Sequence, residues 1–314
     1  MSGEKVLVVA GPTASGKTAL GISLALTLGG EIVSADSMQV YRHMDIGTAK
    51  ATPEERASVP HHMLNVADPS EDYSVSRYVE EASRCCEDIL LRGRVPIIVG
   101  GTGLYIDSFL AGRSFGPRAE DPALRASLNA KYDLLGGEGL LEELRKVDPE
   151  RAAALHSADR KRIVRALEVW LLTGETITAH DEASRAVPPR YVSLFLIPGF
   201  RDRALLYQRI DARVDDMVSR GLFEEVRSLL ASGVPADATA MQAIGYKEAA
   251  ACLRGFLSPE EAVSQIKQAS RRYAKRQLTW FARRSDAFRL YYDEEPFSAS
   301  LAEATLPIAK EFLK

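Results

Sequence analysis

One stretch of this sequence decides its fold: VLVVAGPTASGKT, residues 6–18. The apolar run at 6–10 predicts a buried strand, and residues 19–28 predict a helix that ends at Gly29-Gly30. Between them, residues 11–18 match the phosphate-binding loop pattern of Gly, four residues, Gly-Lys, and Ser or Thr. The alternative is a chance Gly-rich turn, but the full match and both flanks favour the loop. The stretch therefore predicts an α/β protein that binds a di- or triphosphate.

The chemistry of such a loop follows from its backbone. Glycines allow a tight turn in which several N–H groups point inward, and the start of the next helix adds partial positive charge. Lys17 would reach the terminal phosphates, and the hydroxyl of Thr18 would hold Mg²⁺. The predicted diphosphate-binding residues are Gly11, Thr13, Ala14, Ser15, Gly16, Lys17 and Thr18.

The composition excludes several classes of protein. With 314 residues, 26% charged and 46% hydrophobic, the chain suits one large or two smaller soluble domains. It has no run of about 18 apolar residues, and its first strand begins too early for a signal peptide. The three cysteines are too few for a disulfide framework, and His61-His62 predicts a structural or substrate-contacting loop rather than a metal site. We expect a cytoplasmic monomer without membrane contact.

The charge is unevenly distributed along the chain. The net charge is -3, yet residues 267–289 contain eight basic residues and one acid, so this segment is +7 and the remainder is -10. Such a local basic face on an acidic body indicates one polyanion bound in one place. Trp280 and Phe281 lie among these basic residues, which suits backbone contacts together with base stacking. The alternative is that the aromatic residues are core and the basic ones are solvated.

A second strand places a carboxylate near the loop. Residues 31–35 form a short apolar strand that ends at Asp36, and ligands bind at the carboxyl ends of strands in open α/β sheets. A helix N-cap is the alternative role for Asp36. A third strand, 95–99, ends in Gly100-Gly101-Thr102-Gly103-Leu104-Tyr105. Many P-loop nucleotide hydrolases have a magnesium-linked Asp at this place, so the glycines and Thr102 argue against a plain ATPase.

The character of the sequence changes near Gly112. Residues 113–190 contain several helical patterns and no convincing strand, which indicates a helical insertion. A strand at 192–197, long helices at 202–220 and 258–284, a last strand at 288–292 and a terminal helix after Ser298 follow. The predicted domains are residues 1–113, 114–190 and 191–314. The predicted fold is an α/β P-loop kinase-like core, with a parallel sheet flanked by helices, and an all-helical insertion domain.

Two helices carry basic residues outside the loop. In the insertion, a helix after Asp159 ends at Gly174 and is predicted to present residues 160, 161, 162 and 165 as one charged face, for which a solvated surface is the alternative. In the helix at 202–220, Arg209 and Arg213 are one turn apart and therefore on the same side.

At this point the sequence resembles one family, the bacterial tRNA dimethylallyltransferases, also called tRNA isopentenyltransferases. The resemblance covers nearly the full chain in five blocks: residues 11–18, 36–50 (DSMQVYRHMDIGTAK), 100–105 (GGTGLY), 160–170 with Thr173-Gly174, and the pair 242–248 (QAIGYKE) and 273–281 (YAKRQLTWF). One departure is His43, where the family usually has Gly.

The resemblance implies transfer of a dimethylallyl group from its diphosphate to N6 of the adenosine 3′-adjacent to certain tRNA anticodons. Asp36 matches the carboxylate that accepts the proton of the adenine amine, and Thr102 would lie against the same site. Arg213 and Lys17 match the groups that steady the departing diphosphate, with Mg²⁺ on Thr18. The implied partners are the tRNA anticodon arm and dimethylallyl diphosphate.

The resemblance also implies how tRNA is held. A stacked adenine is unreachable until it is flipped into a pocket. The insertion and the basic C-terminal helix would form two sides of a clamp on the anticodon arm. The implied tRNA contacts are Asp36, Ser37, Met38, Gln39, Thr102, Arg160, Lys161, Arg162, Ile163, Val164, Gln242, Gly245, Tyr246, Lys275, Arg276, Gln277 and Trp280.

Two other functions remain open from the residues alone. A small-molecule kinase could use ATP on the same loop with Asp36 as base toward a hydroxyl, which explains residues 1–110 but leaves the basic helix unused. A non-catalytic RNA-binding P-loop protein would leave Asp36 and Thr102 without a role. The magnesium motif Asp-Asp-x-x-Asp of chain-building prenyl synthases is absent from the sequence. The resemblance favours the prenyl donor.

Overall fold

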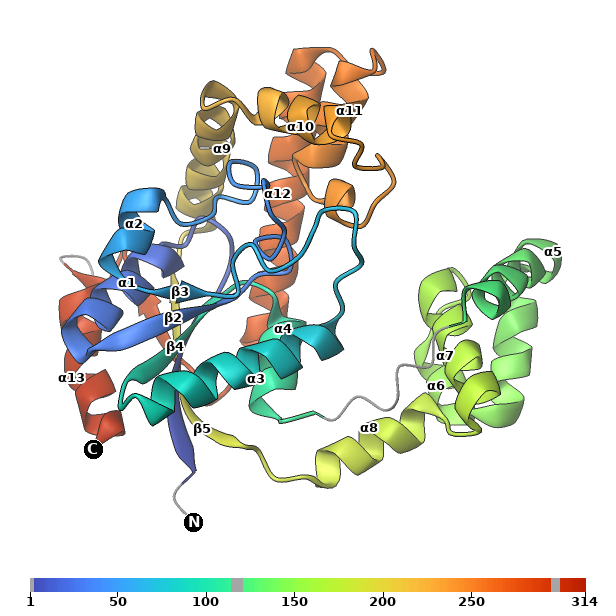
Figure 1. Ribbon diagram of the computed structural model, residues 1–314, viewed down its shortest axis with the longest axis horizontal. Coiled ribbons are helices and arrows are strands. Elements are labelled where there is room, and N and C mark those ends of the chain that lie inside the picture. The colour runs from blue at the N-terminus through green and yellow to red at the C-terminus, as the bar shows by residue number, and fades with distance from the viewer. Residues whose placement is uncertain (1–2, 114–120, 295–299) are drawn as a thin grey trace. The chain divides into compact units, whose positions relative to one another are not determined.

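The computed structural model describes residues 3–113, 121–294 and 300–314 and divides into two compact units (Figure 1). Unit 1 combines Met1–Leu110 with Arg190–Lys314, and unit 2 is Ala111–Pro189. The sequence-based boundaries stood at 113/114 and 190/191. The expected start of the insertion at 114 and of the terminal helix at Ser298 both lie outside the described residues.

Unit 1 is built on one parallel sheet of six strands in the order β3-β2-β4-β1-β5-β6. All residues of β2, and those of β1 from Val6 on, are buried, as expected for apolar strands covered on both faces. The predicted α/β fold with a parallel sheet is confirmed. The strands are β1 Glu4–Ala10, β2 Gly30–Ala35, β3 His61–His62, β4 Val95–Gly100, β5 Tyr191–Gly199 and β6 Phe288–Tyr291.

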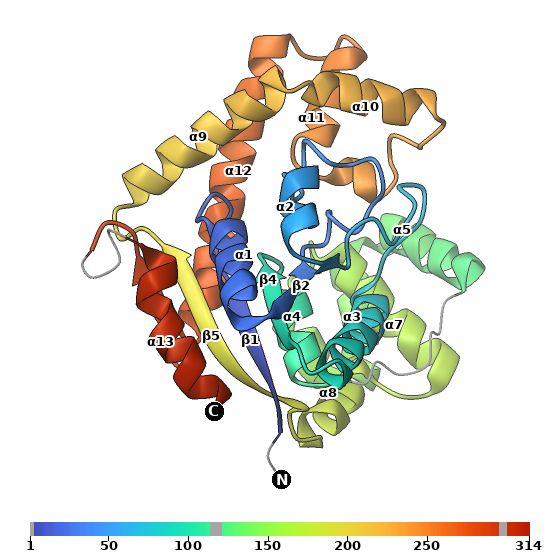
Figure 2. The same ribbon diagram turned by 60° about the vertical axis from the view of Figure 1, so that its left-hand side comes forward.

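Helices cover both faces of this sheet (Figure 2). On one face, α1 (Lys17–Leu28) and α13 (Leu301–Leu313) share a hydrophobic core with alternate residues of the strands, among them Leu7 and Val9. On the other side lie α3 (Val75–Leu91) and α4 (Gly103–Leu110), whose Tyr78 and Tyr105 rings stack. None of the helices in the described ranges is long and apolar enough to cross a membrane.

The remaining helices of unit 1 surround the carboxyl ends of the strands. One of them, α12, also contacts the sheet through the ring of Phe281, which packs against Phe195 of β5. Ser258 caps α12 in a reciprocal pair with Glu261, so this helix begins where the sequence predicted. These helices are α2 Pro53–Ser58, α9 Arg203–Ser219, α10 Leu222–Ala231, the 3₁₀ helix η1 Ala240–Gln242, α11 Tyr246–Leu253 and α12 Pro259–Ala282.

Two local features differ from the expectations. The pair His61-His62 was expected in a loop, but it forms the edge strand β3, because its backbone pairs with β2 and the His62 ring contacts the Glu31 carboxylate at 2.7 Å. His43 has φ = +63°, a backbone conformation that favours glycine. This conformation suits the glycine that the family resemblance predicts at that position.

The described residues of unit 2 form helices and no strand. Their core is a cluster of buried aliphatic residues, mostly leucines of α5 and α7, and its Ile163 is fully buried. The helix α7 ends at Gly174 in a left-handed conformation, as the sequence predicted. The helices are α5 Pro122–Val147, which is interrupted at Gly136, α6 Pro149–Ala154, α7 Arg160–Thr173 and α8 Ile177–Ala186.

Candidate active site

The phosphate-binding loop connects β1 to α1 and borders a cavity of about 600 Å³. At Gly16, φ is +78°, and a Cβ atom would lie 2.3 Å from the hydroxyl oxygen of Tyr292, so only glycine fits. The hydroxyl of Ser15 is buried and has no hydrogen-bond partner in the described structure. A buried hydroxyl without a partner is unfavourable, which suits a ligand that would accept its proton.

Three cations, Lys17, Arg209 and Arg213, border this cavity without an ion-pair partner among the described residues. Lys17 donates from Nζ to the carbonyl oxygen of Pro12 at 2.5 Å. Burial, together with repulsion from Arg213, lowers the pKa of Lys17 to about 7, although Asp36 opposes the shift. Burial also lowers the pKa of Arg213. The site therefore disfavours its own positive charges until an anion is bound.

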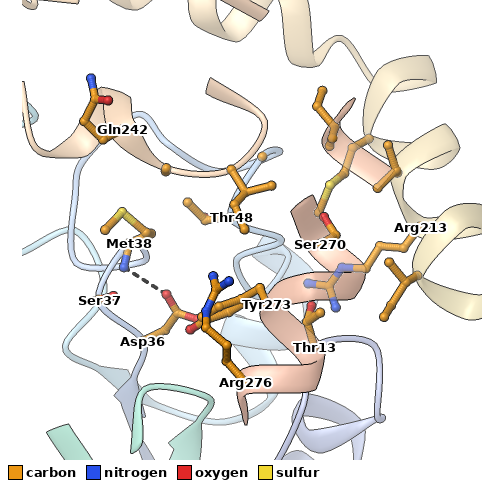
Figure 3. A pocket seen from close by; sticks show the side chains of 17 residues that line it. Thr13, Asp36, Ser37, Met38, Thr48, Arg213, Gln242, Ser270, Tyr273 and Arg276 are labelled. Carbon is orange, nitrogen blue, oxygen red and sulfur yellow. Dashed lines mark hydrogen bonds between the residues drawn. The ribbon is translucent and has the colours of Figure 1, made fainter. Parts of the chain in front are cut away.

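The two arginines of α9 approach the loop from one side, as the sequence predicted. Arg209 donates from Nε to the carbonyl oxygen of Ala14 at 3.2 Å and lies over the ring of Phe200. Arg213 borders the cavity, and its guanidinium points toward Thr13 (Figure 3). Both arginines border the space that a ligand would fill, and Arg209 in addition braces the loop.

Asp36 occupies the turn directly after β2. Its Oδ1 accepts the backbone N–H groups of Met38 at 2.9 Å and Gln39 at 3.3 Å, so Asp36 holds a turn. The alternative of a helix N-cap is wrong, because the next helix, α2, begins only at Pro53. In the described part of the chain, Oδ2 accepts no hydrogen bond. One carboxylate therefore both holds the turn and keeps an oxygen for a ligand.

Thr102 fixes the position of Asp36. Its Oγ1 accepts the backbone N–H of Ser37 at 3.0 Å, and its own N–H donates to the carbonyl oxygen of Ala35 at 3.1 Å. The chain on both sides of Asp36 is thus hydrogen-bonded to Thr102.

Sequence reasoning missed Tyr273 as a site residue. Its ring lies beside Asp36 (Figure 3), and burial together with the Asp36 charge raises the pKa of its hydroxyl to about 12. It borders both the phosphate cavity and a second one. Its spacing of four residues from Gln277 puts the two side chains on one helix face, which was the available clue.

The second cavity adjoins the first and is largely apolar, with a volume of about 270 Å³. Five residues border both: Thr13, Asp36, Thr48, Arg213 and Tyr273. The site thus joins a charged space, lined by Lys17, Arg209 and Arg213 together with the carboxylates of Asp36, Glu55 and Asp216, to a largely apolar one, and Asp36 borders both. The apolar lining comes from Met38, Ile210, Val214, Met217, Ala243, Ile244 and Ile266.

Some of the predicted tRNA contacts are accessible. On α12, Lys275, Arg276 and Trp280 are exposed and border a shallow hollow with Thr279 and Arg283. Gln242 is also exposed, whereas Ser37 and Met38 are partly buried beside Asp36. In unit 2, Lys161 and Arg162 are exposed on α7.

Other predicted contacts are buried, which corrects the expectation. Ile163 and Val164 are core residues of unit 2, and Tyr246 is fully buried beside Gly245. Arg160 donates to Asn129 and Asp133, so its guanidinium is already bound within the protein. Arg165 pairs with the buried Glu168. The four basic residues of α7 therefore do not form one freely solvated face.

Two glutamines are also committed inside the protein. Gln39 accepts from Ser34 and donates to the carbonyl oxygens of Thr48 and Ala49, which pins the loop at 48–49. Gln277 is only 5% exposed, and its Oε1 accepts the N–H of Thr13 at 2.9 Å. The Thr13 amide, expected to bind phosphate, is therefore already occupied.

Comparison with known proteins identifies the family. The family model "IPP transferase" matches residues 39–285, and the model "Isopentenyl transferase" matches residues 4–65. The chain belongs to the IPP transferase family. The family resemblance predicted from the sequence is confirmed.

Individual relatives of the IPP transferase family agree over most of the chain. The tRNA dimethylallyltransferase of Carboxydothermus hydrogenoformans is 48% identical over 281 residues, 89% of each chain, and that of Geobacter metallireducens is 49% identical over 289 residues, 92% of this chain and 93% of its own. The crystal structure of the tRNA isopentenylpyrophosphate transferase of Bacillus halodurans is similar with a TM-score of 0.73 and 40% identity, covering 99% and 97% of the chains. A eukaryotic dimethylallyltransferase solved acting on tRNA has a TM-score of 0.85 and 30% identity over 99% of this chain and 79% of its own.

Proposed function

We propose that this protein transfers a dimethylallyl group from dimethylallyl diphosphate to N6 of the adenosine 3′-adjacent to the anticodon of tRNA, releasing diphosphate. The observation that carries the proposal is the pair of joined cavities, one that borders the phosphate loop and its cations and one largely apolar, that meet at Asp36. A prenyl diphosphate has a charged end and an apolar end of this kind. The names of relatives that align over about 90% of their length support the same reaction.

The leaving group would be received by the cavity at the phosphate loop, beside Lys17 and Arg213. Diphosphate gains negative charge as the allylic C–O bond breaks, so groups that bind it more strongly at that moment accelerate the reaction. Lys17, Arg213 and the backbone amides from Ala14 to Thr18 are the donors available there, together with the unpartnered hydroxyl of Ser15. The lowered pKa of Lys17 supports an anionic ligand, because binding one restores its charge.

The acceptor amine would be activated at Asp36. The lone pair of an adenine N6 amine is delocalised, so removal of a proton during attack assists bond formation, typically by ~10²–10⁴-fold. The Asp36 oxygen that is not used in the turn is the acceptor we assign to this proton. Thr102 holds the backbone on both sides of Asp36, and the ring of Tyr273 lies beside its carboxylate.

Mg²⁺ would bind together with the diphosphate rather than to the protein alone. No group of three or more His, Cys, Asp or Glu side chains in the described ranges could hold a metal. Mg²⁺ commonly uses one or two protein oxygens with phosphates and waters, and Thr18 supplies a hydroxyl at the cavity. The donor set therefore fits the ion, which would neutralise part of the diphosphate charge.

The anticodon arm of tRNA would bind at the exposed basic and aromatic surface of α12, where Lys275, Arg276 and Trp280 lie. Phosphate contacts by the basic residues and base stacking by the indole suit RNA. The kinase alternative gives this surface no role.

The test is transfer in the absence of ATP. Purified protein is incubated with unmodified tRNA, Mg²⁺ and dimethylallyl diphosphate, and the digested nucleosides are weighed by mass spectrometry. We expect an adenosine that has gained a five-carbon unit. Product that forms only when ATP is added would support the kinase alternative, and the absence of any prenylated adenosine would contradict the proposal.

A further inference from the structure

Gln277 joins two segments of the active site that are far apart in sequence. Its side chain lies on the inner face of α12, and its Oε1 accepts the backbone N–H of Thr13 at 2.9 Å. Its Nε2 donates to the carbonyl oxygen of Gly101 at 2.9 Å, in a buried contact. Both ends of the side-chain amide are therefore used. The oxygen accepts a hydrogen bond and the nitrogen donates one, so neither group could take the place of the other.

The two segments would serve different parts of the reaction, the departure of diphosphate and the removal of a proton from the amine. Thr13 belongs to the loop that would receive the diphosphate. Gly101 precedes Thr102, which holds the backbone on both sides of Asp36. Figure 3 shows Thr13 and Asp36 at the same cavity, with Tyr273 between them. The bridge therefore runs between the leaving-group loop and the segment of the base.

The sheet does not make this connection itself. The last paired residues of β1 and β4 are Ala10 and Gly100. The backbone that follows each of them lies outside the sheet. The fit at the bridge is also close, since a Cβ atom on Gly101 would lie 2.3 Å from Gln277 Nε2. The backbone of Gly101 does not have a positive φ, so its conformation would allow a side chain. It is the side-chain amide of Gln277 that leaves no room for one.

We propose that Gln277 is a positioning residue for the transfer step, which sets the separation between the phosphate loop and Asp36. This inference rests on the proposed function. In a displacement reaction, misplacement by about 1 Å lowers the rate by up to ~10²-fold. Gln277 would make no direct contact with RNA, although the neighbouring basic residues Lys275 and Arg276 would.

The first experiment separates rate from affinity. Gln277→Met keeps the length of the side chain and removes both hydrogen bonds. We expect its single-turnover rate at saturating substrates to fall ~10–100-fold while its Kd for tRNA stays within ~3-fold. The matched control is Gln268→Met, an exposed glutamine on the same helix, which should retain the wild-type rate.

The second experiment leaves Gln277 intact. Gly101→Ala should displace the amide and lower the rate on its own, so it tests the bridge even where Gln277→Met folds poorly. Gln277→Ala makes room for the new methyl group, and Gly101→Ala should then add little to its effect. This double-mutant cycle measures the coupling between the two residues directly.

The outcomes are distinguishable. A wild-type protein that forms no prenylated adenosine contradicts the proposed function and this inference together. An active wild type with an unchanged rate in Gln277→Met, or with additive effects in the cycle, contradicts this inference alone. A loss of tRNA affinity at a normal saturated rate would make Gln277 an RNA contact instead and also overturn the proposal.

Discussion

The hydroxyl of Tyr246 donates a hydrogen bond of 2.5 Å to Glu225 Oε1, deep beneath the loop that follows Met44. The same carboxylate accepts the backbone N–H groups of Asp45, Ile46 and Gly47, at 2.9, 2.8 and 3.1 Å. Gly47 and its neighbour Thr48 border the apolar cavity. Glu225 thus holds one wall of the site from outside, and its charge raises the pKa of Tyr246, whose burial has the larger effect.

Glu225→Gln should weaken this wall, because an amide in place of the carboxylate turns one acceptor into a donor facing other donors. We expect the free energy of unfolding to fall by roughly 1–3 kcal/mol, measured by urea denaturation. Glu224→Gln is the matched control, since that adjacent carboxylate is exposed and pairs only with Arg227 at 3.4 Å among the described residues. Equal effects in the two variants would mean that the bonds to residues 45–47 contribute little.

Asp36→Asn should lower the rate of transfer without disturbing the turn. The amide oxygen can still accept the N–H of Met38, whereas the group can no longer take a proton. We expect the single-turnover rate at saturating substrates to fall by ~10²–10⁴-fold with tRNA affinity nearly unchanged. A variant that retained most of its rate would restrict Asp36 to holding the turn.

Lys275→Ala and Arg276→Ala should each weaken tRNA binding and flatten its dependence on salt. Removing one phosphate interaction reduces the slope of log affinity against log salt by about 0.7–0.9. Lys267→Ala is the control on the same helix, because that lysine is already paired with Asp215 at 2.7 Å. Affinity is measured by filter binding over a series of salt concentrations, and unchanged slopes for both residues would identify a merely solvated face.

Glu31 should make the protein sensitive to acid. Hydrogen bonds from Arg92 lower its pKa to about 2, against the opposing effect of burial, and His62 contributes in the same direction. A carboxylate with a folded-state pKa below its unfolded value of 4.5 stabilises the fold above pH 4.5. That stabilisation is lost as the pH falls toward 2.

Glu31→Gln should accordingly lower the free energy of unfolding by roughly 1–3 kcal/mol at neutral pH and flatten its decline between pH 4.5 and 2. Urea denaturation across this range provides the measurement. Glu80→Gln is the control, because the Glu80–Arg84 pair is exposed on both sides and contributes ~0–1 kcal/mol. A parallel decline in wild type and Glu31→Gln would contradict the assignment.

The strand–loop–helix at the N-terminus and the place of Asp36 could be predicted because each depends on local pattern and on the general geometry of parallel sheets. The direction of side chains on helices could not be predicted from the motifs. Ile163 and Tyr246 belong to matching blocks, yet both are buried, since a motif identifies residues that occur together and not the face that packs.

The spacing of residues on α12 could have predicted that Gln277 is buried. Ala274, Gln277 and Phe281 are spaced by three and four residues, and all three are buried on α12. The polar character of the amide and its basic neighbours suggested a surface position instead. The two-residue strand β3 offered no such clue, because a periodic pattern needs more residues than it has.

The placement of β1 between β4 and β5 has a consequence for how the protein is made. The ribosome delivers β1 and its loop first, but the strand that closes the second edge of β1 is synthesised only after the whole of Ala111–Pro189. Arg213 and Gln277 emerge later still. A nascent chain therefore carries an incomplete phosphate loop through most of its synthesis, and the folding of unit 1 has to wait while unit 2, a continuous segment, is free to fold first.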